Sequence, residues 1–179
     1  VERSAGLRQD QRSRLPLEEP AFVLGPSEHP EEDEEARPRP GQGPLVTALP
    51  ELPALPVDGV VLANELLDNL AFHLLERGSD GWAEVRVGET DGRLVEVLVP
   101  ARPELGAEAD ELVGDVAVGT RMPLQHQAQE WVRSALACVR SGRVVVVDYA
   151  TDTADLAARP WAEWLRTYRG HGRGGHPLE

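Results

Sequence analysis

Two short apolar runs in this chain each stop abruptly in polar residues, and this feature constrains the fold more than any other. The runs are Val60 to Ala63 and the four valines from Val144 to Val147. They are followed by polar residues: Asn64, Glu65 and Asp68 after the first, Asp148 and Tyr149 after the second. Four valines without alternation predict a strand buried on both faces, in a parallel sheet covered by helices. Because ligands bind at the carboxyl ends of the strands in open α/β sheets, the sequence predicts an α/β fold with a site at that edge.

The carboxylates of Glu65 and Asp68 have two interpretations. A helical turn over Glu65 to Leu70 would place them at positions i and i+3, on one face. Two such carboxylates facing a cleft could hold a guanidinium, bind a metal or act as general bases. They could equally well do no more than charge and cap the start of a helix. The spacing alone leaves both interpretations open.

The remaining elements follow from periodicity and turn residues. Ser4 caps a predicted helix that runs to about Leu15, and a short strand is predicted over Ala21 to Leu24. Three strands separated by glycine turns predict a β-meander: Phe72 to Arg77, Trp82 to Val87 and Leu94 to Val99. Two helices are predicted further along, over Glu108 to Val113 and over Leu124 to Arg140, the second with Gly142 as its C-cap.

Composition excludes several classes of function. A net charge of −13 argues against binding to nucleic acid, and no apolar run is long enough to insert into a membrane. Residues 28–43 are acidic and rich in proline and glycine, which predicts a disordered insertion. The single cysteine, Cys138, excludes an internal disulfide and fits a reducing, cytoplasmic compartment. The five histidines are scattered, so no metal site is predicted.

Glu2 is a further candidate, because it lies between what looks like the end of a strand and the helix cap at Ser4. An acidic residue after the second strand of a doubly wound sheet typically accepts hydrogen bonds from a ribose diol. Acidic residues are also common at helix starts as partners of the helix dipole. A chain that begins at Val1, directly before Glu2, looks like an internal piece of a longer protein.

Several stretches together resemble a known family. They are Val1 to Gln11, Ala63 to Leu70, Trp131, Val144 to Tyr149 and Leu165 to His171. The chain resembles the MidA-like family of S-adenosylmethionine-dependent methyltransferases, whose mitochondrial members assist complex I assembly by methylating an arginine. The resemblance implies a class I methyltransferase fold, a Rossmann-like doubly wound sheet that is incomplete here. Residues 1–179 would then be a partial methyltransferase domain, and residues 72–119 an inserted meander and helical region on the substrate side.

The resemblance also implies roles for the candidate residues. Glu65 and Asp68 would be catalytic, Glu2 and Asn64 would bind the S-adenosylmethionine cofactor, and Asp148 and Tyr149 would lie on the substrate side. The substrate would be a protein, through an arginine side chain, and a homodimer is an expected assembly. The family's glycine-rich cofactor loop would precede Glu2 and is absent from the sequence, and Ala71 stands where relatives usually have proline.

Two other functions remain open at this point. One is a non-catalytic assembly or interaction module that keeps the fold without the cofactor. The other is a nicotinamide-dependent oxidoreductase on a similar sheet, although nothing in the sequence resembles a hydride-transfer site.

Overall fold

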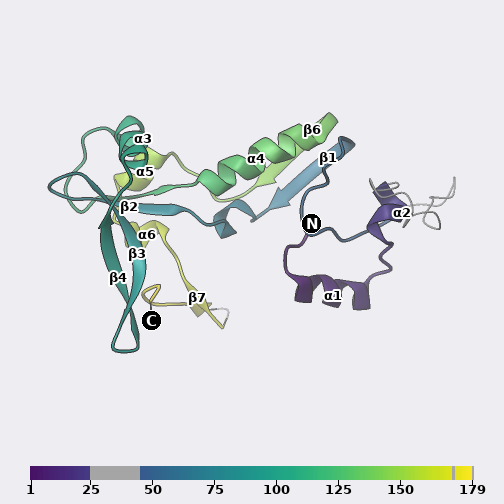
Figure 1. Ribbon diagram of the computed structural model, residues 1–179, viewed down its shortest axis with the longest axis horizontal. Coiled ribbons are helices and arrows are strands. Elements are labelled where there is room, and N and C mark those ends of the chain that lie inside the picture. Colours follow the sequence, from purple (N-terminus) through teal and green to yellow (C-terminus); the bar gives the residue numbers. More distant parts are fainter. Residues whose placement is uncertain (25–44, 171, 179) are drawn as a thin grey trace. The chain divides into compact units, whose positions relative to one another are not determined.

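The structure of the protein is a computed structural model that describes residues 1–24, 45–170 and 172–178 (Figure 1). The predicted disordered insertion over residues 28–43 lies outside this described part. The fold is α/β with mixed sheets, and the chain divides into two compact units. Unit 1 comprises Val1–Leu62 and Val132–Val145, and unit 2 comprises Ala63–Trp131 and Val146–Glu179. Three elements contribute residues to both units: β1, α4 and β6.

The N-terminal segment of unit 1 is helical. Helix α1 (Ala5–Arg14) begins as predicted at Ser4, whose hydroxyl oxygen accepts a hydrogen bond from the Leu7 N–H at 3.3 Å. The strand predicted over Ala21 to Leu24 is wrong, because these residues belong to a short helix, α2 (Pro20–Leu24). Pro20 is the first residue of this helix, where its fixed φ favours helical backbone.

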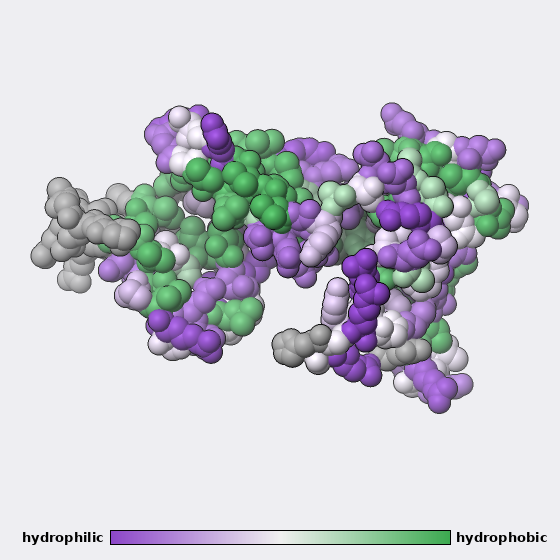
Figure 2. Space-filling view, turned by 180° about the vertical axis from the view of Figure 1, so that it is seen from behind, coloured by the Kyte–Doolittle hydropathy of each residue, from purple (hydrophilic) through white to green (hydrophobic). Residues whose placement is uncertain are grey.

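Strands β1 (Val57–Asn64) and β6 (Val139–Val147) form a two-stranded sheet. Asp58 binds Arg140, and further along the Glu65 N–H donates to the Val147 carbonyl oxygen at 2.8 Å, so both strands run in the same direction. The predicted parallel pairing is therefore present. The predicted burial on both faces is wrong, since Val147 is 53% exposed. A sheet of two strands leaves apolar side chains at the surface, as Figure 2 shows in green.

Gly142 does not cap the preceding helix, as the sequence predicted. Helix α4 (His126–Cys138) ends at Cys138 and β6 begins at the next residue, so Gly142 lies inside the strand. Its φ is 142°, and a Cβ atom there would overlap the backbone carbonyl of Gly59 on β1. Close approach of two strand backbones, and not helix termination, is what requires glycine at this position.

Unit 2 is built on a four-stranded antiparallel sheet with the order β4-β3-β2-β5. Its strands are β2 (His73–Arg77), β3 (Trp82–Thr90), β4 (Arg93–Pro100) and β5 (Arg121–Leu124). The predicted meander is confirmed, and β5 adds a fourth strand beside β2. Asp91 and Gly92 both have positive φ, 51° and 74°, which matches the tight turn that joins paired antiparallel strands.

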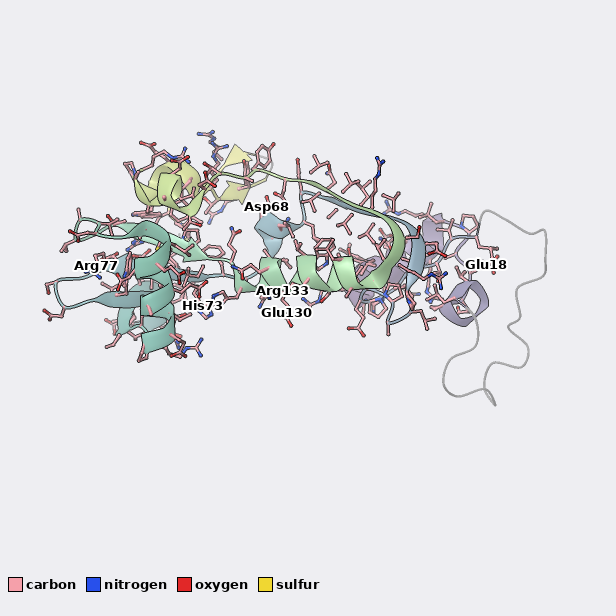
Figure 3. All side chains as sticks on the ribbon, turned by 90° about the horizontal axis from the view of Figure 1, so that it is seen from above. Glu18, Asp68, His73, Arg77, Glu130 and Arg133 are labelled. Carbon is pink, nitrogen blue, oxygen red and sulfur yellow. The ribbon has the colours of Figure 1, made fainter. Side chains whose placement is uncertain are left out.

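Helices α3 (Pro103–Val113) and α5 (Thr153–Ala157) supply the rest of the core of unit 2. The core residues are apolar and buried: Leu75, Trp82, Leu105, Ala109, Met122, Leu124 and Ala157. On β2, Leu75 lies opposite Met122 of β5 and Glu84 of β3. Because side chains alternate along a strand, His73 and Arg77 share this face with Leu75 and lie at its two ends. Polar groups therefore border the core at both ends of β2 (Figure 3).

The last elements are short. They are the 3-10 turn η1 (Leu67–Asn69), helix α6 (Trp161–Trp164), and a small hairpin of β7 (Tyr168–Arg169) and β8 (Gly172–Arg173). None of the helices in the described ranges combines the length and apolar character needed to cross a membrane.

Candidate functional site

The carboxyl ends of β1 and β6 meet within unit 2. The Glu65 N–H donates to the Val147 carbonyl oxygen at 2.8 Å, and the Leu67 N–H donates to Oδ2 of Asp148 at 2.7 Å. Asn64 is the last residue of β1 and is exposed. The two predicted strand ends therefore lie side by side, and the polar residues after them form one edge.

Asp148 holds this edge together. Its Oδ2 accepts from Leu67, the first residue of η1, and its Oδ1 accepts from the Tyr149 N–H at 2.9 Å. Both oxygens are thus engaged with backbone, which fixes the turn after β1 against the end of β6. The side chain of Tyr149 has no such constraint and is 82% exposed.

The helical turn predicted over Glu65 to Leu70 is shorter than expected, and it excludes Glu65. Glu65 has a φ of 48°, in the left-handed region, and only Leu67–Asn69 are helical. The Glu65 N–H bonds to the Val147 carbonyl oxygen and the Leu67 N–H bonds to the Asp148 carboxylate, so the chain turns sharply at Glu65. Glu65 and Asp68 therefore do not share a helix face. Left-handed backbone in a residue other than glycine costs on the order of 1 kcal/mol and is enriched at functional sites.

Asn69 stabilises this turn. Its side-chain Nδ2 donates to the Glu65 carbonyl oxygen and to Oδ1 of Asp68, both at 2.9 Å. Glu65 and Asp68 are both exposed, and Figure 3 shows Asp68 on the η1 turn. Two carboxylates therefore lie on one short loop at the edge, available to a cationic ligand.

Glu2 belongs to unit 1. Its Oε1 accepts the Ser4 N–H at 2.7 Å, directly before α1, so one of its oxygens serves the helix start. Within the described residues, its Oε2 makes no hydrogen bond. The helix-cap interpretation of Glu2 is therefore observed for one oxygen, and ribose binding stays a prediction for the other.

Sequence reasoning missed a histidine–carboxylate cluster in unit 2. Nδ1 of His73 lies 2.6 Å from Oε1 of Glu84, and Arg86 donates to Oε2 of Glu84 through Nε at 2.9 Å and Nη2 at 2.6 Å. The His126 ring lies edge-on to the His73 ring, 5.5 Å away, and its Nε2 is 2.7 Å from Oε2 of Glu108. Glu84 is buried, and the hydrogen bonds from His73 and then Arg86 hold its pKa below its ordinary value. Alternation could have placed Glu84 and Arg86 on one face of their strand, but only the register of β2 against β3 brings His73 to them.

Arg121 forms a second cluster that the sequence did not indicate. It bonds Glu76 at 2.6 Å and both oxygens of Glu96 at 3.0 and 2.6 Å, and its guanidinium lies 4.8 Å from the Trp161 ring centroid. The Arg121 guanidinium lowers the pKa of Glu96. Because the Arg121 side chain is only 10% exposed and fully engaged, this cluster ties β2, β4, β5 and α6 together and offers nothing to a ligand.

No group of three or more histidine, cysteine, aspartate or glutamate side chains in the part of the chain that the structure describes is arranged to hold a metal ion.

Comparison with solved structures defines the class of protein. An uncharacterised protein from Burkholderia thailandensis, in its native form, is 28% identical with a TM-score of 0.67, over 83% of this chain and 40% of that chain. A second solved structure from Burkholderia thailandensis, described as a "likely methyl transferase" bound to S-adenosyl-homocysteine, is 27% identical with a TM-score of 0.66, over 98% of this chain and 40% of that chain. The chain thus spans about 40% of the length of these α/β relatives.

The family follows from a match over nearly the whole chain. Residues 1–178 match the family described as "putative S-adenosyl-L-methionine-dependent methyltransferase", and the chain belongs to this family. A search of the curated proteins found no match.

Proposed function

We propose that this chain carries the substrate-side part of a methyl-transfer site, in a protein that uses S-adenosylmethionine to methylate an arginine side chain of another protein. The observation that carries the proposal is the polar edge formed by Asn64, Glu65 and Asp148 in a chain that matches the methyltransferase family over residues 1–178. The relative that contains S-adenosyl-homocysteine, the product of methyl transfer, supports the choice of cofactor.

The chemistry of this edge fits a cationic cofactor. S-adenosylmethionine supplies an electrophilic methyl group on a sulfonium cation. Carboxylates stabilise nearby positive charge, and Glu65 and Asp68 are exposed on the loop after β1. The amide of Asn64, also exposed, can accept or donate a hydrogen bond. We assign Asn64 and Glu2 to the cofactor; Oε2 of Glu2 would accept from ribose hydroxyl groups.

An arginine substrate suits the same loop. A guanidinium is permanently protonated and offers a planar fork of donors that matches a carboxylate. Because both oxygens of Asp148 are bound to backbone, Glu65 and Asp68 are the carboxylates that we assign to the substrate. Tyr149, exposed beside them in sequence, would contact the substrate from the end of β6. We also propose a cytoplasmic location, a protein substrate and a homodimer.

Calorimetry with the longest natural form of the protein tests the proposed class. We expect S-adenosyl-homocysteine to bind and NAD to give no heat of binding. Binding of NAD alone would favour an oxidoreductase. A folded protein that binds neither compound would favour the assembly module without a cofactor.

Glu65→Gln tests the assigned site. The variant keeps the shape of the side chain and removes its charge, so we expect transfer of labelled methyl from S-adenosylmethionine to arginine-containing protein to fall by about 10-fold or more, the loss expected for roughly 1.4 kcal/mol of transition-state stabilisation. Glu111→Gln, the same change at an exposed position of α3, is the matched control and should leave turnover unchanged. Equal turnover in both variants would remove Glu65 from the site.

A further inference from the structure

The histidine–carboxylate cluster of unit 2 has the composition of an acid–base site. It consists of His73 on β2, Glu84 and Arg86 on β3, Glu108 on α3 and His126 at the start of α4. His73 is five residues after Asp68 and is the first residue of β2, the strand that follows the η1 turn (Figure 3). The cluster therefore lies next in sequence to the loop that carries Glu65 and Asp68.

The charge of Glu84 decides which nitrogen of His73 carries the proton. Glu84 is only 7% exposed, yet the bonds from His73 and Arg86 keep its pKa low, so its carboxylate is ionised at neutral pH. An ionised carboxylate only accepts hydrogen bonds, so the Nδ1 atom of His73, 2.6 Å from Oε1, must be the protonated nitrogen. In the neutral ring, Nε2 then holds the lone pair.

The second ring nitrogen of His73 is open to solvent. Within the described residues, Nε1 of Trp164 is the buried side-chain nitrogen or oxygen atom without a partner. Nε2 of His73 has no hydrogen bond there, so it is not a buried atom. The His73 side chain is 32% exposed. A fixed ring with a buried anion behind it and an accessible lone pair in front is the arrangement of a general base.

The other groups around His73 do not form a hydrogen bond with this lone pair. On β3, Arg86 is occupied by Glu84, and on β5 the residue opposite His73 is the apolar Leu124. His126 of α4 touches the ring edge-on, and its Nε2 is bound to Glu108 of α3. None of these groups donates a hydrogen bond to Nε2 of His73.

We propose that His73 is the base that takes the proton released when the substrate nitrogen is methylated, with Glu84 and Arg86 as its positioning residues. This proposal rests on the proposed methyltransferase function. The substrate N–CH₃ bond forms as the S–CH₃ bond breaks, neutral S-adenosylhomocysteine leaves, and the positive charge passes to the methylated nitrogen. That nitrogen loses one proton to Nε2 of His73. The resulting imidazolium is stabilised by the Glu84 carboxylate, and solvent later removes its proton.

His73→Asn in the longest natural form of the protein tests the assignment. The Asn amide can still donate to Glu84 in place of Nδ1, while the base is lost. We expect kcat for methyl transfer to fall by about 10²–10⁴-fold, with unchanged binding of S-adenosyl-homocysteine. Because a general base acts in its deprotonated form, kcat of the wild-type protein should rise with pH. This rise should disappear in the variant. His176→Asn makes the same change at a histidine outside the cluster, beside Glu96, and is the matched control, with kcat expected within about 3-fold of wild type, well below the loss of a general base.

Three results distinguish a wrong role for His73 from a wrong function for the protein. A His73→Asn variant that turns over like the wild type, or keeps its pH profile, overturns the role of His73 and leaves the methyltransferase function standing. A wild-type protein that transfers no methyl group overturns both. Nitrogen NMR of the imidazoles is independent of activity: the neutral His73 ring should carry its proton on Nδ1, and a proton on Nε2 would overturn the proposal.

Discussion

The carboxylates of this chain fall into two kinds, those bound to other groups of the protein and those exposed to solvent. Asp148 gives both oxygens to backbone N–H groups and so shapes the edge at the ends of β1 and β6. Glu84 gives its oxygens to His73 and Arg86 at a nearly buried position of β3. Glu65 holds strained backbone with its side chain exposed. At the residue scale, the carboxylates bound to the protein build the structure, and those left exposed are the candidates for ligands.

Glu84 should make the stability of unit 2 sensitive to acid. Its pKa is lowered from 4.5 by His73 and Arg86, so its contribution is fully present above pH 4.5 and is lost as the pH falls through the lower folded value. We expect Glu84→Gln to cost about 1–3 kcal/mol of unfolding free energy at pH 7, because the charged partners lose their acceptor. Urea unfolding should show the difference shrinking as the pH falls below 4.5.

Glu89→Gln is the control for this measurement, since Glu89 is exposed on the same strand. It should unfold like the wild type at both ends of the pH range. A Glu84→Gln deficit that is constant from pH 7 into the acid range would show that the ionised carboxylate contributes no stability.

At the scale of elements, structure set by neighbouring residues could be predicted from the sequence. Contacts between residues far apart in the sequence could not. The Ser4 cap, the meander and the order of the long elements follow from neighbouring residues. The exposure of Val147 depends on how many strands the sheet has, which periodicity along one strand cannot reveal. The role of Gly142 depends on the approach of Gly59, 83 positions earlier in the chain, and the His73–Glu84 contact depends on strand register. The candidate edge was predictable from its two strand ends, but the left-handed turn at Glu65 was not.

Gly142 of β6 should tolerate no side chain. We expect Gly142→Ala to cost about 1–3 kcal/mol or more, because its Cβ would overlap the Gly59 carbonyl and its φ of 142° disfavours other residues. Gly59→Ala is the matched control, as a Cβ there would meet nothing within 4 Å. Amide hydrogen exchange in β1 and β6 should accelerate in Gly142→Ala alone. Equal exchange in the two variants would show that these strands can separate without cost.

At the scale of the whole molecule, charge and apolar surface act against each other. The net charge of −13 produces repulsion that opposes association of copies of the chain at pH 7, and the sequence pI is about 4.8. Val60 and Leu62 on β1 are 65% and 66% exposed, and an exposed apolar strand promotes association when repulsion is removed.

Association should therefore be strongest near pH 4.8 and should depend on the apolar side chains of β1. We expect light scattering of the chain to rise steeply as the pH falls from 7 towards 4.8, where the net charge vanishes. The double variant Val60→Thr and Leu62→Thr leaves the charge unchanged, so a several-fold lower scattering at pH 4.8 would isolate the apolar contribution. Val118→Thr removes a side chain that is 70% exposed in unit 2 and should scatter like the wild type. If the double variant associates as strongly as Val118→Thr, the surface of β1 does not drive association.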